Sequence, residues 1–167
     1  MNAVTVKDQD LRQAAGEGMD AFVACFVTAI QDAIGGELTP DTMSQLNADQ
    51  ITLLAWQTLH EEVMDGGFVQ LIHNGYGTFI FKNPFAKAVK LWGLRDLSKL
   101  IYDAHSLWLK YRSEIERELT EDEFMALFEQ MPEFDDLDDA FIENEEEWTS
   151  MVAHYVDEHL ERFASVE

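Results

Sequence analysis

Apolar residues recur every three or four positions along nearly the whole chain, which is the period of an amphipathic helix. The first long run extends from Met19 to Ile30, and the glycine pair at 35–36 ends it. Proline, glycine and capping residues divide the rest of the chain into similar runs. The helices predicted in this way cover residues 19–34, 40–46, 48–65, 68–73, 84–92, 94–111, 120–131 and about 145–163. The pattern predicts an all-α fold.

Several of these boundaries carry specific signals. Thr39 is placed as an N-cap before Pro40, and Thr120 with Glu123 has the sequence of a capping box. The stretch GTFIF at 77–81 is the least helical and is expected to form a short extended segment. No Pro/Gly/Ser-rich linker, internal repeat or low-complexity tract interrupts the chain. We therefore expect a single domain that spans residues 1–167.

A different pattern marks residues 133–148, EFDDLDDAFIENEEEW. Nine of these sixteen positions are Asp or Glu, and none is Lys or Arg. Large apolar residues nevertheless recur near helical intervals, so on a helix they would share one face while the acids fall mostly off it. These anchors are Phe134, Leu137, Phe141 and Trp148. Burying an aromatic side chain contributes about 2–3 kcal/mol, whereas a like-charged i,i+4 pair costs roughly a few tenths. We therefore expect an ordered helix that displays its acids.

The composition agrees with a folded protein that has an acidic surface. Of the 167 residues, 47% are apolar and 11% aromatic, which is enough for a sizeable core. Acids outnumber bases by 33 to 11, so the net charge is −22 at pH 7. This surplus repels DNA, RNA and anionic membranes, and it favours basic partners. The first residues lack the order of a signal peptide, and the apolar run at 21–30 is too short to cross a bilayer. We expect a cytoplasmic protein.

The charge is distributed unevenly along the chain. Residues 1–67 carry a net charge of −9, residues 68–112 carry +5, and residues 113–167 carry −18. The C-terminal third therefore holds most of the surplus. The basic middle is expected to neutralise part of the acidic remainder within the same molecule.

Motifs for metal, nucleotide or nucleophilic chemistry fail their spacing rules in this sequence. The acidic segment lacks the glycine of a calcium loop, and HEEVM at 60–64 lacks the second His of a zinc-protease helix. The glycines at 65–77 match neither a dinucleotide-binding motif nor a P-loop, and a helix end followed by a turn explains them better. Cys25 lies in an apolar run without an evident base, so we expect a small buried hydrophobe. We expect no catalytic residue, cofactor or metal.

The stretch EEVMDGGFVQLIHNGYG (61–77), followed by AVKLWGLRDLSKLI (88–101), resembles a bacterial family of small all-helical proteins. The family motif, [N/D]-G-G-F-x-Q-x-x-x-N-x-x-G, is matched by Asp65, Gly66, Gly67, Phe68, Gln70, Asn74 and Gly77. The acidic segment resembles the family's F-x-x-L-D-x-x-F region, and the resemblance covers about residues 47–163. It implies an acidic DNA mimic of about this size that occupies the DNA-binding surface of a helix-turn-helix transcription factor. It implies no catalytic role for the glycine motif, which we interpret as a tight turn between helices.

We therefore interpret the chain as a non-enzymatic regulator that binds a DNA-binding protein through an acidic face and keeps it off its DNA. Carboxylates three or four residues apart on a helix are separated by about 5–6 Å at Cβ, which is comparable with phosphate spacing along one strand. The predicted partner-binding acids are Glu114, Glu116, Glu118, Glu121, Asp122, Glu129, Glu133, Asp135, Asp136, Asp138, Asp139, Glu143, Glu145, Glu146 and Glu147. Candidate extensions of this surface are Asp20, Asp32, Glu61 and Glu62.

Two other classes of function stay open at this point. One is a hydrolase or metal-binding protein with a pocket near the glycine turns, where Gln70, His73 and Asn74 would lie. The other is an acidic adaptor or chaperone for basic proteins. The sequence is compatible with a monomer and with a homodimer, and it does not identify the target.

Overall fold

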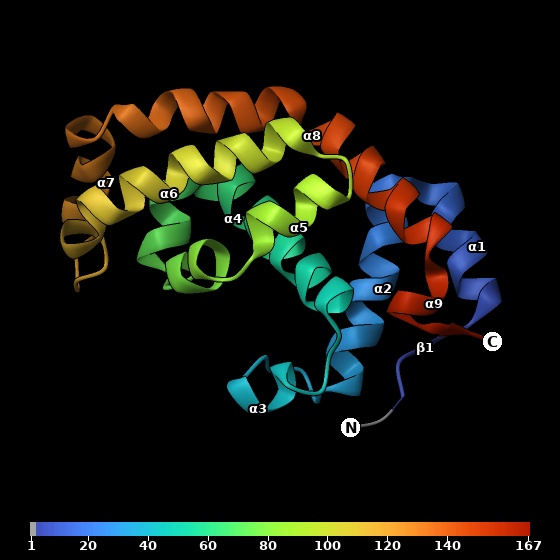
Figure 1. Cartoon of the computed structure of the whole chain (residues 1–167). Coiled ribbons are helices and arrows are strands. Elements are labelled where there is room, and N and C mark those ends of the chain that lie inside the picture. Colours follow the sequence, from blue (N-terminus) through green and yellow to red (C-terminus); the bar gives the residue numbers. More distant parts are fainter. Residues whose placement is uncertain (1–2) are drawn as a thin grey trace. The chain divides into compact units, whose positions relative to one another are not determined.

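The computed structural model describes residues 3–167, and helices dominate it (Figure 1). The predicted all-α class is confirmed. The strands in the described residues are two short segments, β1 (Thr5–Val6) and β2 (Ser165–Val166), which pair in parallel. No helix within residues 3–167 combines the length and the apolar character needed to span a bilayer.

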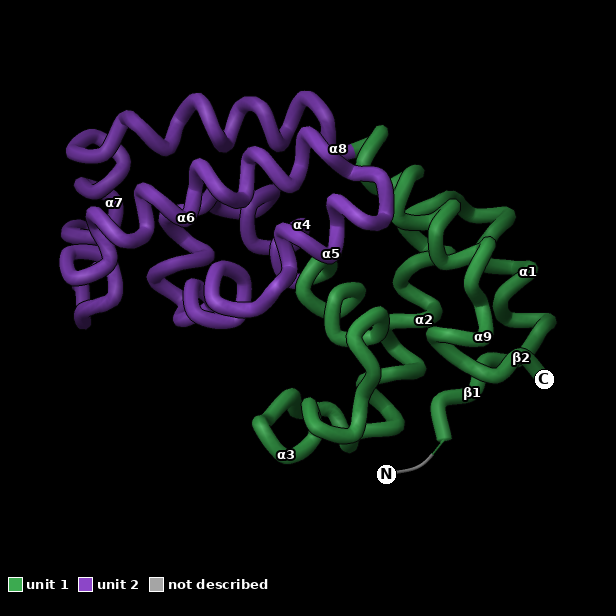
Figure 2. Tube along the Cα trace, in the orientation of Figure 1, with its two compact units in different colours: residues 1–57, 146–167 green, residues 58–145 purple. Residues whose placement is uncertain are grey.

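The chain folds as two compact units, which Figure 2 shows in different colours. The first unit contains residues 1–57 and 146–167, and the second contains residues 58–145. Two long helices, α4 (Ala48–His73) and α8 (Glu133–Glu158), each contribute residues to both units. The expectation of a single domain stays a prediction.

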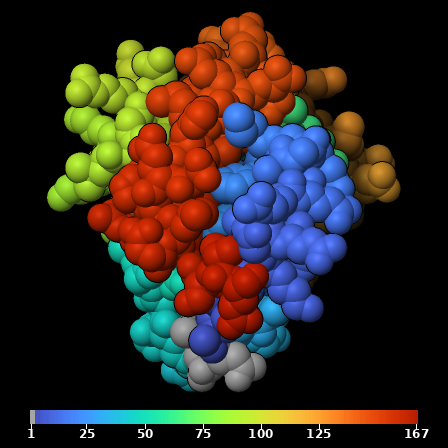
Figure 3. Space-filling view, turned by 90° about the vertical axis from the view of Figure 1, so that its right-hand side faces the viewer, coloured from blue at the N-terminus to red at the C-terminus, as the bar shows by residue number. Residues whose placement is uncertain are grey.

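The first unit combines the N-terminal helices with the C-terminal end of the chain. Figure 3 shows the C-terminal residues (red) lying against the N-terminal helices (blue). Phe26 is fully buried and packs edge-to-face against Phe22 and Phe163, with ring centroids 5.4 and 6.4 Å away. The amide of Gln50 donates a hydrogen bond to the carbonyl of Phe163 across 3.0 Å. Besides parts of α4 and α8 and the two strands, the unit contains α1 (Asp8–Glu17), α2 (Met19–Ala33), α3 (Pro40–Met43) and α9 (Leu160–Phe163).

The second unit holds the basic middle of the chain and most of the acids of its C-terminal third. Besides parts of α4 and α8, it contains η1 (Thr78–Lys82), α5 (Phe85–Leu91), α6 (Arg95–Ile115) and α7 (Glu121–Gln130). The beginning of α8 runs beside α6 (Figures 1 and 2). The core of the second unit includes the buried rings of Phe68, Trp108, Phe134 and Phe141. Two of the aromatic anchors predicted for the acidic segment therefore belong to this core.

Both predicted capping motifs are confirmed. Thr39 and Thr42 cap α3 reciprocally, each side chain accepting from the other residue's backbone N–H, and Pro40 stands at the first helical position. Thr120 and Glu123 cap α7 in the same way. Such a pair satisfies two backbone donors that a helix leaves without partners. These two helices therefore begin where the local sequence predicts.

The glycine pair at 66–67 interrupts α4, as the sequence predicts. Gly66 has φ −149° and ψ 15°, and Gly67 has φ 77° and ψ −177°, so both residues leave helical geometry. A second helical segment begins at Phe68. The positive φ of Gly67 lies in a region that side chains disfavour, which accounts for glycine at this position.

The extended segment expected at 77–81 was wrong. Residues Thr78–Lys82 form the π-helical turn η1. Ile80 and Phe81 are adjacent, and both are buried. A strand would point neighbouring side chains to opposite faces, whereas a helical turn lets both face the core.

The predicted start and end of the last helix were also wrong. α8 begins at Glu133, well before residue 145, and ends at Glu158; the short α9 follows it. No Gly or Pro occurs between Glu133 and Glu158. The buried anchors of the acidic segment, Phe134, Phe141 and Trp148, continue the helical spacing of the residues that follow. One continuous helix therefore includes both the acidic segment and the helix predicted after it.

Candidate partner-binding surface

The predicted partner-binding acids divide into two groups by exposure. Asp138 and Glu145 are half-buried. The exposed group consists of Glu114, Glu116, Glu118, Glu121, Asp122, Glu129, Glu133, Asp135, Asp136, Asp139, Glu143, Glu146 and Glu147. Glu146 and Glu147 belong to the first unit, and the other exposed acids belong to the second.

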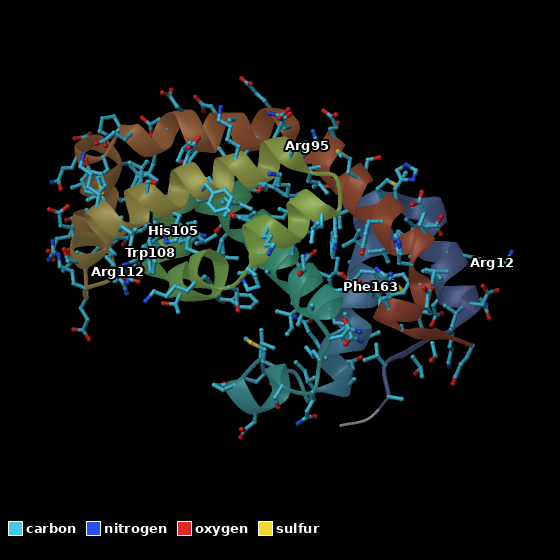
Figure 4. The ribbon with its side chains drawn as sticks, viewed as in Figure 1. Arg12, Arg95, His105, Trp108, Arg112 and Phe163 are labelled. Carbon is cyan, nitrogen blue, oxygen red and sulfur yellow. The ribbon has the colours of Figure 1, made fainter. Side chains whose placement is uncertain are left out.

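One group of exposed acids in the second unit lies on α8. Asp135, Asp136, Asp139 and Glu143 follow one another at steps of one, three and four residues, so they share one side of the helix. We call these four residues the α8 acidic face. Figure 4 shows carboxylate oxygens (red) projecting outward from this part of α8. Ile142 is 51% exposed among them, so the face also offers an apolar contact.

The α8 acidic face has no partner within the molecule. None of its four carboxylates makes a hydrogen bond or an ion pair within residues 3–167. The backbone that carries them is fixed by Phe134 and Phe141, whose rings are buried. The prediction of an ordered helix that displays acids is therefore confirmed for this segment. A partner would find these charges already ordered, so binding would not have to offset the loss of backbone freedom that a tail suffers.

Two other exposed acids, Glu133 and Glu116, form ion pairs with neighbouring bases in the second unit. Glu133 accepts a hydrogen bond from the hydroxyl of Tyr111 and lies 3.2 Å from the ammonium of Lys110, and these contacts lower its pKa. Glu116 pairs with Arg112 at 2.8 Å. Both remain at the surface, but part of their charge is neutralised.

Asp138 was placed off the apolar face of its helix by the sequence, and this was wrong. Its Oδ1 atom accepts a hydrogen bond from the backbone N–H of Phe68 across 2.9 Å. Burial raises the pKa of this carboxyl to about 6, although the bond from Phe68 acts in the opposite direction. Asp138 follows Phe134 by four residues and precedes Phe141 by three, a spacing that indicates the buried side.

Glu145 has a comparable inward position. Its Oε2 atom lies 2.8 Å from Nε2 of His60, and the two side chains are only 20% and 25% exposed. The ring of His60 also lies near Phe141, with centroids 6.1 Å apart. Glu145 therefore joins α8 to α4 inside the second unit.

The candidate extensions of the surface are of different kinds. Asp20 and Asp32 are exposed on α2 in the first unit, and Glu61 is exposed on α4 in the second. Glu62 is half-buried, and its Oε2 atom accepts hydrogen bonds from the side-chain amides of Gln70 (2.8 Å) and Asn74 (3.1 Å). Glu62 is thus a local structural acceptor.

The glycine motif at 65–77 packs against its own surroundings. The amide of Gln70 donates to Glu62 and also to Asp65, at 2.9 Å. A Cβ added at Gly66 would lie 1.9 Å from the side chain of Gln70, so the missing side chain leaves room for this amide to fold back. The interpretation of the motif as a turn between helical segments agrees with these contacts.

The last glycine of the motif faces an aromatic cluster. A Cβ at Gly77 would lie 2.4 Å from Nε1 of the buried Trp108. Figure 4 labels Trp108 beside His105 and Arg112. The His105 and Trp108 ring centroids are 5.5 Å apart, and the guanidinium of Arg112 lies 4.2 Å from the Trp108 ring centroid. Gly77 therefore permits a close approach that no larger residue would allow.

The side chains proposed for a pocket near the glycine turns, Gln70, His73 and Asn74, form hydrogen bonds with other groups of the protein. Nδ1 of His73 donates to the carbonyl of Ile115 across 2.8 Å, and its ring packs on Phe124. Within residues 3–167, no group of three or more His, Cys, Asp or Glu side chains is arranged to hold a metal ion. Cys25 is half-buried, less buried than expected, and burial raises the pKa of its thiol, which disfavours a reactive thiolate.

The expected neutralisation of acids by the basic middle is limited to two residues. Within residues 3–167, Lys110 and Arg112 are the bases of the segment 68–112 that make ion pairs. The remaining five bases of that segment make none. Most of the acidic surplus is therefore not compensated by this segment.

Comparison with known proteins identifies the family. The family model described as DMP19-like protein matches residues 44–159, more than half of the chain. The chain belongs to this family. DNA mimic protein DMP19 of Neisseria meningitidis serogroup B (strain ATCC BAA-335 / MC58) is 34% identical over 168 residues, which cover 99% of this chain and 98% of the relative. The match to the DMP19-like family thus includes all of α8 and the glycine motif, and it confirms the family resemblance noted in the sequence.

Proposed function

We propose that this member of the DMP19-like family is a DNA mimic that occupies the DNA-binding surface of a helix-turn-helix transcription factor. The α8 acidic face carries the proposal, because it presents unpaired carboxylates on an ordered helix. The relative that is similar over almost its whole length is named a DNA mimic protein. Exposed acids on or near α7 would extend the contact: Glu114, Glu118, Glu121, Asp122 and Glu129.

The charge pattern suits the groups that normally bind phosphates. Duplex DNA presents one charge per about 1.7 Å of axis. Carboxylates at helical i,i+3 and i,i+4 spacing stand about 5–6 Å apart at Cβ. Lys and Arg side chains, and the N-termini of helices, bind carboxylate oxygens as they bind phosphate oxygens. An ordered row of carboxylates can therefore satisfy the same donors.

The consequence of such binding would be regulatory. A transcription factor held on the acidic surface leaves its operator, and the genes that a repressor controls are then expressed. No catalytic step is involved, and the proposed location is the cytoplasm, where such a factor works. A general adaptor for basic proteins would bind many cationic proteins with similar affinity, whereas a mimic should bind its target with a fixed stoichiometry.

The proposal is tested by finding the target and then removing charge. Extract of the cells that produce the protein is passed over the immobilised chain, washed at moderate salt and read by mass spectrometry. The recovered factor is then tested in a gel-shift competition with its own operator. The wild-type protein should release the operator DNA from the factor. Failure to displace DNA from any helix-turn-helix factor bound in this way contradicts the proposal.

A charge-matched pair of variants separates the acidic face from net charge. The test variant removes four charges from the α8 acidic face: Asp135→Asn, Asp136→Asn, Asp139→Asn and Glu143→Gln. The control removes four exposed charges of the first unit: Asp10→Asn, Glu17→Gln, Glu37→Gln and Glu161→Gln. The test variant should lose the competition while the control keeps it. Equal losses in both would indicate that only total charge matters, as for an adaptor.

Binding should also weaken steeply as salt is added. The carboxylates are exposed, so their attraction is screened over about 8–10 Å at physiological ionic strength. Electrostatic complementarity acts mainly on the association rate. Stopped-flow or biosensor measurements should therefore show association slowing more than dissociation accelerates.

A further inference from the structure

The ion pairs of this protein leave one group of cations unused. Within residues 3–167, the Lys and Arg side chains that pair with acids are those of Arg12, Lys110, Arg112, Arg117 and Arg162. Four exposed cations on two neighbouring helices make no such pair: Lys87, Lys90, Arg95 and Lys99. This is unexpected in a chain with 33 acids and 11 bases.

These cations form one surface because α5 and α6 pack together. The hydroxyl of Ser98 on α6 donates to the carbonyl of Ala86 on α5 across 2.7 Å, and both residues are buried. The two helices are joined by a short turn at Gly93, where φ is 98°. Figure 1 shows α5 beside the first half of α6, and Figure 3 shows the corresponding yellow-green side chains projecting together.

Large apolar side chains are exposed on the same surface. Leu91 is 78% exposed, directly after Lys90 on α5. On α6, Tyr102 is 53% exposed and Leu109 is 59% exposed. Tyr102 follows Lys99 by three residues, and Leu109 follows Tyr102 by seven, so they share one side of the helix. We call the four cations with these three apolar residues the α5–α6 basic face.

The acids near this face do not neutralise it. Asp96 and Asp103 are exposed on α6 at distances of three and four residues from Lys99. Neither makes an ion pair with a lysine or arginine within residues 3–167. Four cations against two acids leave the face positive within a molecule that is strongly negative. Leu91, Tyr102 and Leu109 add exposed apolar contacts beside these charges.

We propose that the α5–α6 basic face binds an acidic amphipathic segment of a partner protein. Its glutamates or aspartates would pair with Lys87, Lys90, Arg95 and Lys99. Its apolar side chains would cover Leu91, Tyr102 and Leu109. This contact uses no residue of the α8 acidic face, so it does not depend on the proposed DNA mimicry.

The combination of charge and exposed apolar area favours a polypeptide over other anions. A phosphate backbone has no apolar groups that could pack against Leu91 or Leu109. A long duplex or a membrane surface extends well beyond the four cations, and its charge would meet the acidic remainder of a protein with net charge −22. A short acidic segment covers the basic face alone, and repulsion from more distant acids is screened over about 8–10 Å.

A defined probe tests this proposal on the full-length protein. The probe is a synthetic, fluorescently labelled amphipathic helical peptide with glutamates flanking a leucine stripe. Its control replaces every glutamate by glutamine. Fluorescence anisotropy should show saturable binding of the glutamate peptide and weaker binding of the glutamine peptide. Hydrogen exchange should slow on α5 and on α6 as far as Leu109 when the glutamate peptide binds.

Matched variants assign the binding to this face. The triple variant Lys87→Gln, Lys90→Gln and Lys99→Gln should bind the peptide at least about tenfold more weakly. The control variant Lys7→Gln, Arg12→Gln and Arg117→Gln has the same net charge and should bind like the wild type. Circular dichroism should show that both variants are folded. Leu91→Ser with Leu109→Ser should also weaken binding, because the leucine stripe loses its contacts.

The alternative occupants give different results. Tighter binding of a DNA duplex or of phosphatidylserine vesicles than of the peptide would overturn the choice of a polypeptide. Self-association in sedimentation velocity that the triple variant abolishes would assign the face to a second copy and overturn the proposal. Unchanged peptide binding by the triple variant would overturn it as well. None of these results bears on competition with DNA at the α8 acidic face.

Discussion

The carboxylate of Asp138 accepts a hydrogen bond from the backbone N–H of Phe68 across 2.9 Å. Phe68 is the first residue after the glycine kink of α4, so the carboxylate caps the second helical segment. A Cβ at Gly67 would lie 2.4 Å from Oδ2 of the same carboxylate. The glycine motif and the acidic segment, which the sequence marks separately, therefore meet at this bond.

Asp138 should make the stability of the protein depend on pH. Burial raises its pKa from 3.8 to about 6, and the charges of Asp135 and Asp139 act in the same direction. The folded state therefore holds this proton more tightly than the unfolded state. The resulting stabilisation is fully present below about pH 4 and is lost as the pH rises through about 6. The difference corresponds to roughly 3 kcal/mol at most, and urea unfolding at a series of pH values measures it.

Two substitutions of Asp138 separate its charge from its hydrogen bond. Asp138→Asn keeps an oxygen acceptor without the buried charge, so it should unfold no more easily than the wild type at pH 7 and should lose this pH dependence. Asp138→Ala removes the cap as well and should be less stable than the Asn variant by about 1 kcal/mol. Identical pH profiles for the wild type and the Asn variant would refute the buried charge.

The close approach of Gly77 to Trp108 predicts a steric effect. Gly77 has φ −55°, which suits any residue, so Gly77→Ala tests the contact with the ring alone. The substitution should lower the free energy of unfolding by about 1–3 kcal/mol through overpacking. Gly16→Ala is the control. Gly16 lies within helix α1, and a methyl group added there would meet nothing within 4 Å. It should stabilise by about 0.5–1 kcal/mol. Thermal unfolding that shifts both variants in the same direction would contradict this account.

The aromatic anchors of α8 should carry much of the stability of that helix. Phe141 is fully buried and Trp148 is 4% exposed. Phe141→Ala and Trp148→Ala should each cost about 3–5 kcal/mol in chemical unfolding. Ile142→Ala alters an exposed neighbour and should change stability by less than about 0.5 kcal/mol. If Phe141→Ala and Trp148→Ala each cost less than about 0.5 kcal/mol, α8 is only loosely attached to the core.

Glu143 and Glu145 should behave in opposite ways although they are two residues apart. Glu145→Gln weakens the half-buried hydrogen bond with His60 and should cost up to about 1 kcal/mol of stability. It should leave the competition with DNA unchanged. Glu143→Gln removes a charge from the α8 acidic face and should weaken that competition without loss of stability. Unfolding and gel-shift measurements on both variants test this difference. If Glu145→Gln weakened the competition with DNA and Glu143→Gln did not, the inward face of α8 would be the one that contacts the partner.

The sequence by itself determined the helical class, the Thr39 N-cap, the Thr120–Glu123 capping box, the glycine kink and the ordered display of acids on α8. These features depend on residues one to four positions apart, whose spacing a sequence shows directly. Phe134 and Phe141, for instance, specify the buried side of α8 without any knowledge of what they pack against.

The tertiary structure alone decided which acids are structural and which are free. Asp138 bonds to a backbone group 70 residues away, and Glu145 pairs with a side chain 85 residues away. In the sequence both look like further members of an acidic run. The four cations Lys87, Lys90, Arg95 and Lys99 are a similar case, since only the packing of α5 on α6 brings them onto one surface, where none of them makes an ion pair within residues 3–167. The energy of a charge depends on burial and on its neighbours in space, and these are fixed only when distant segments of the chain come together.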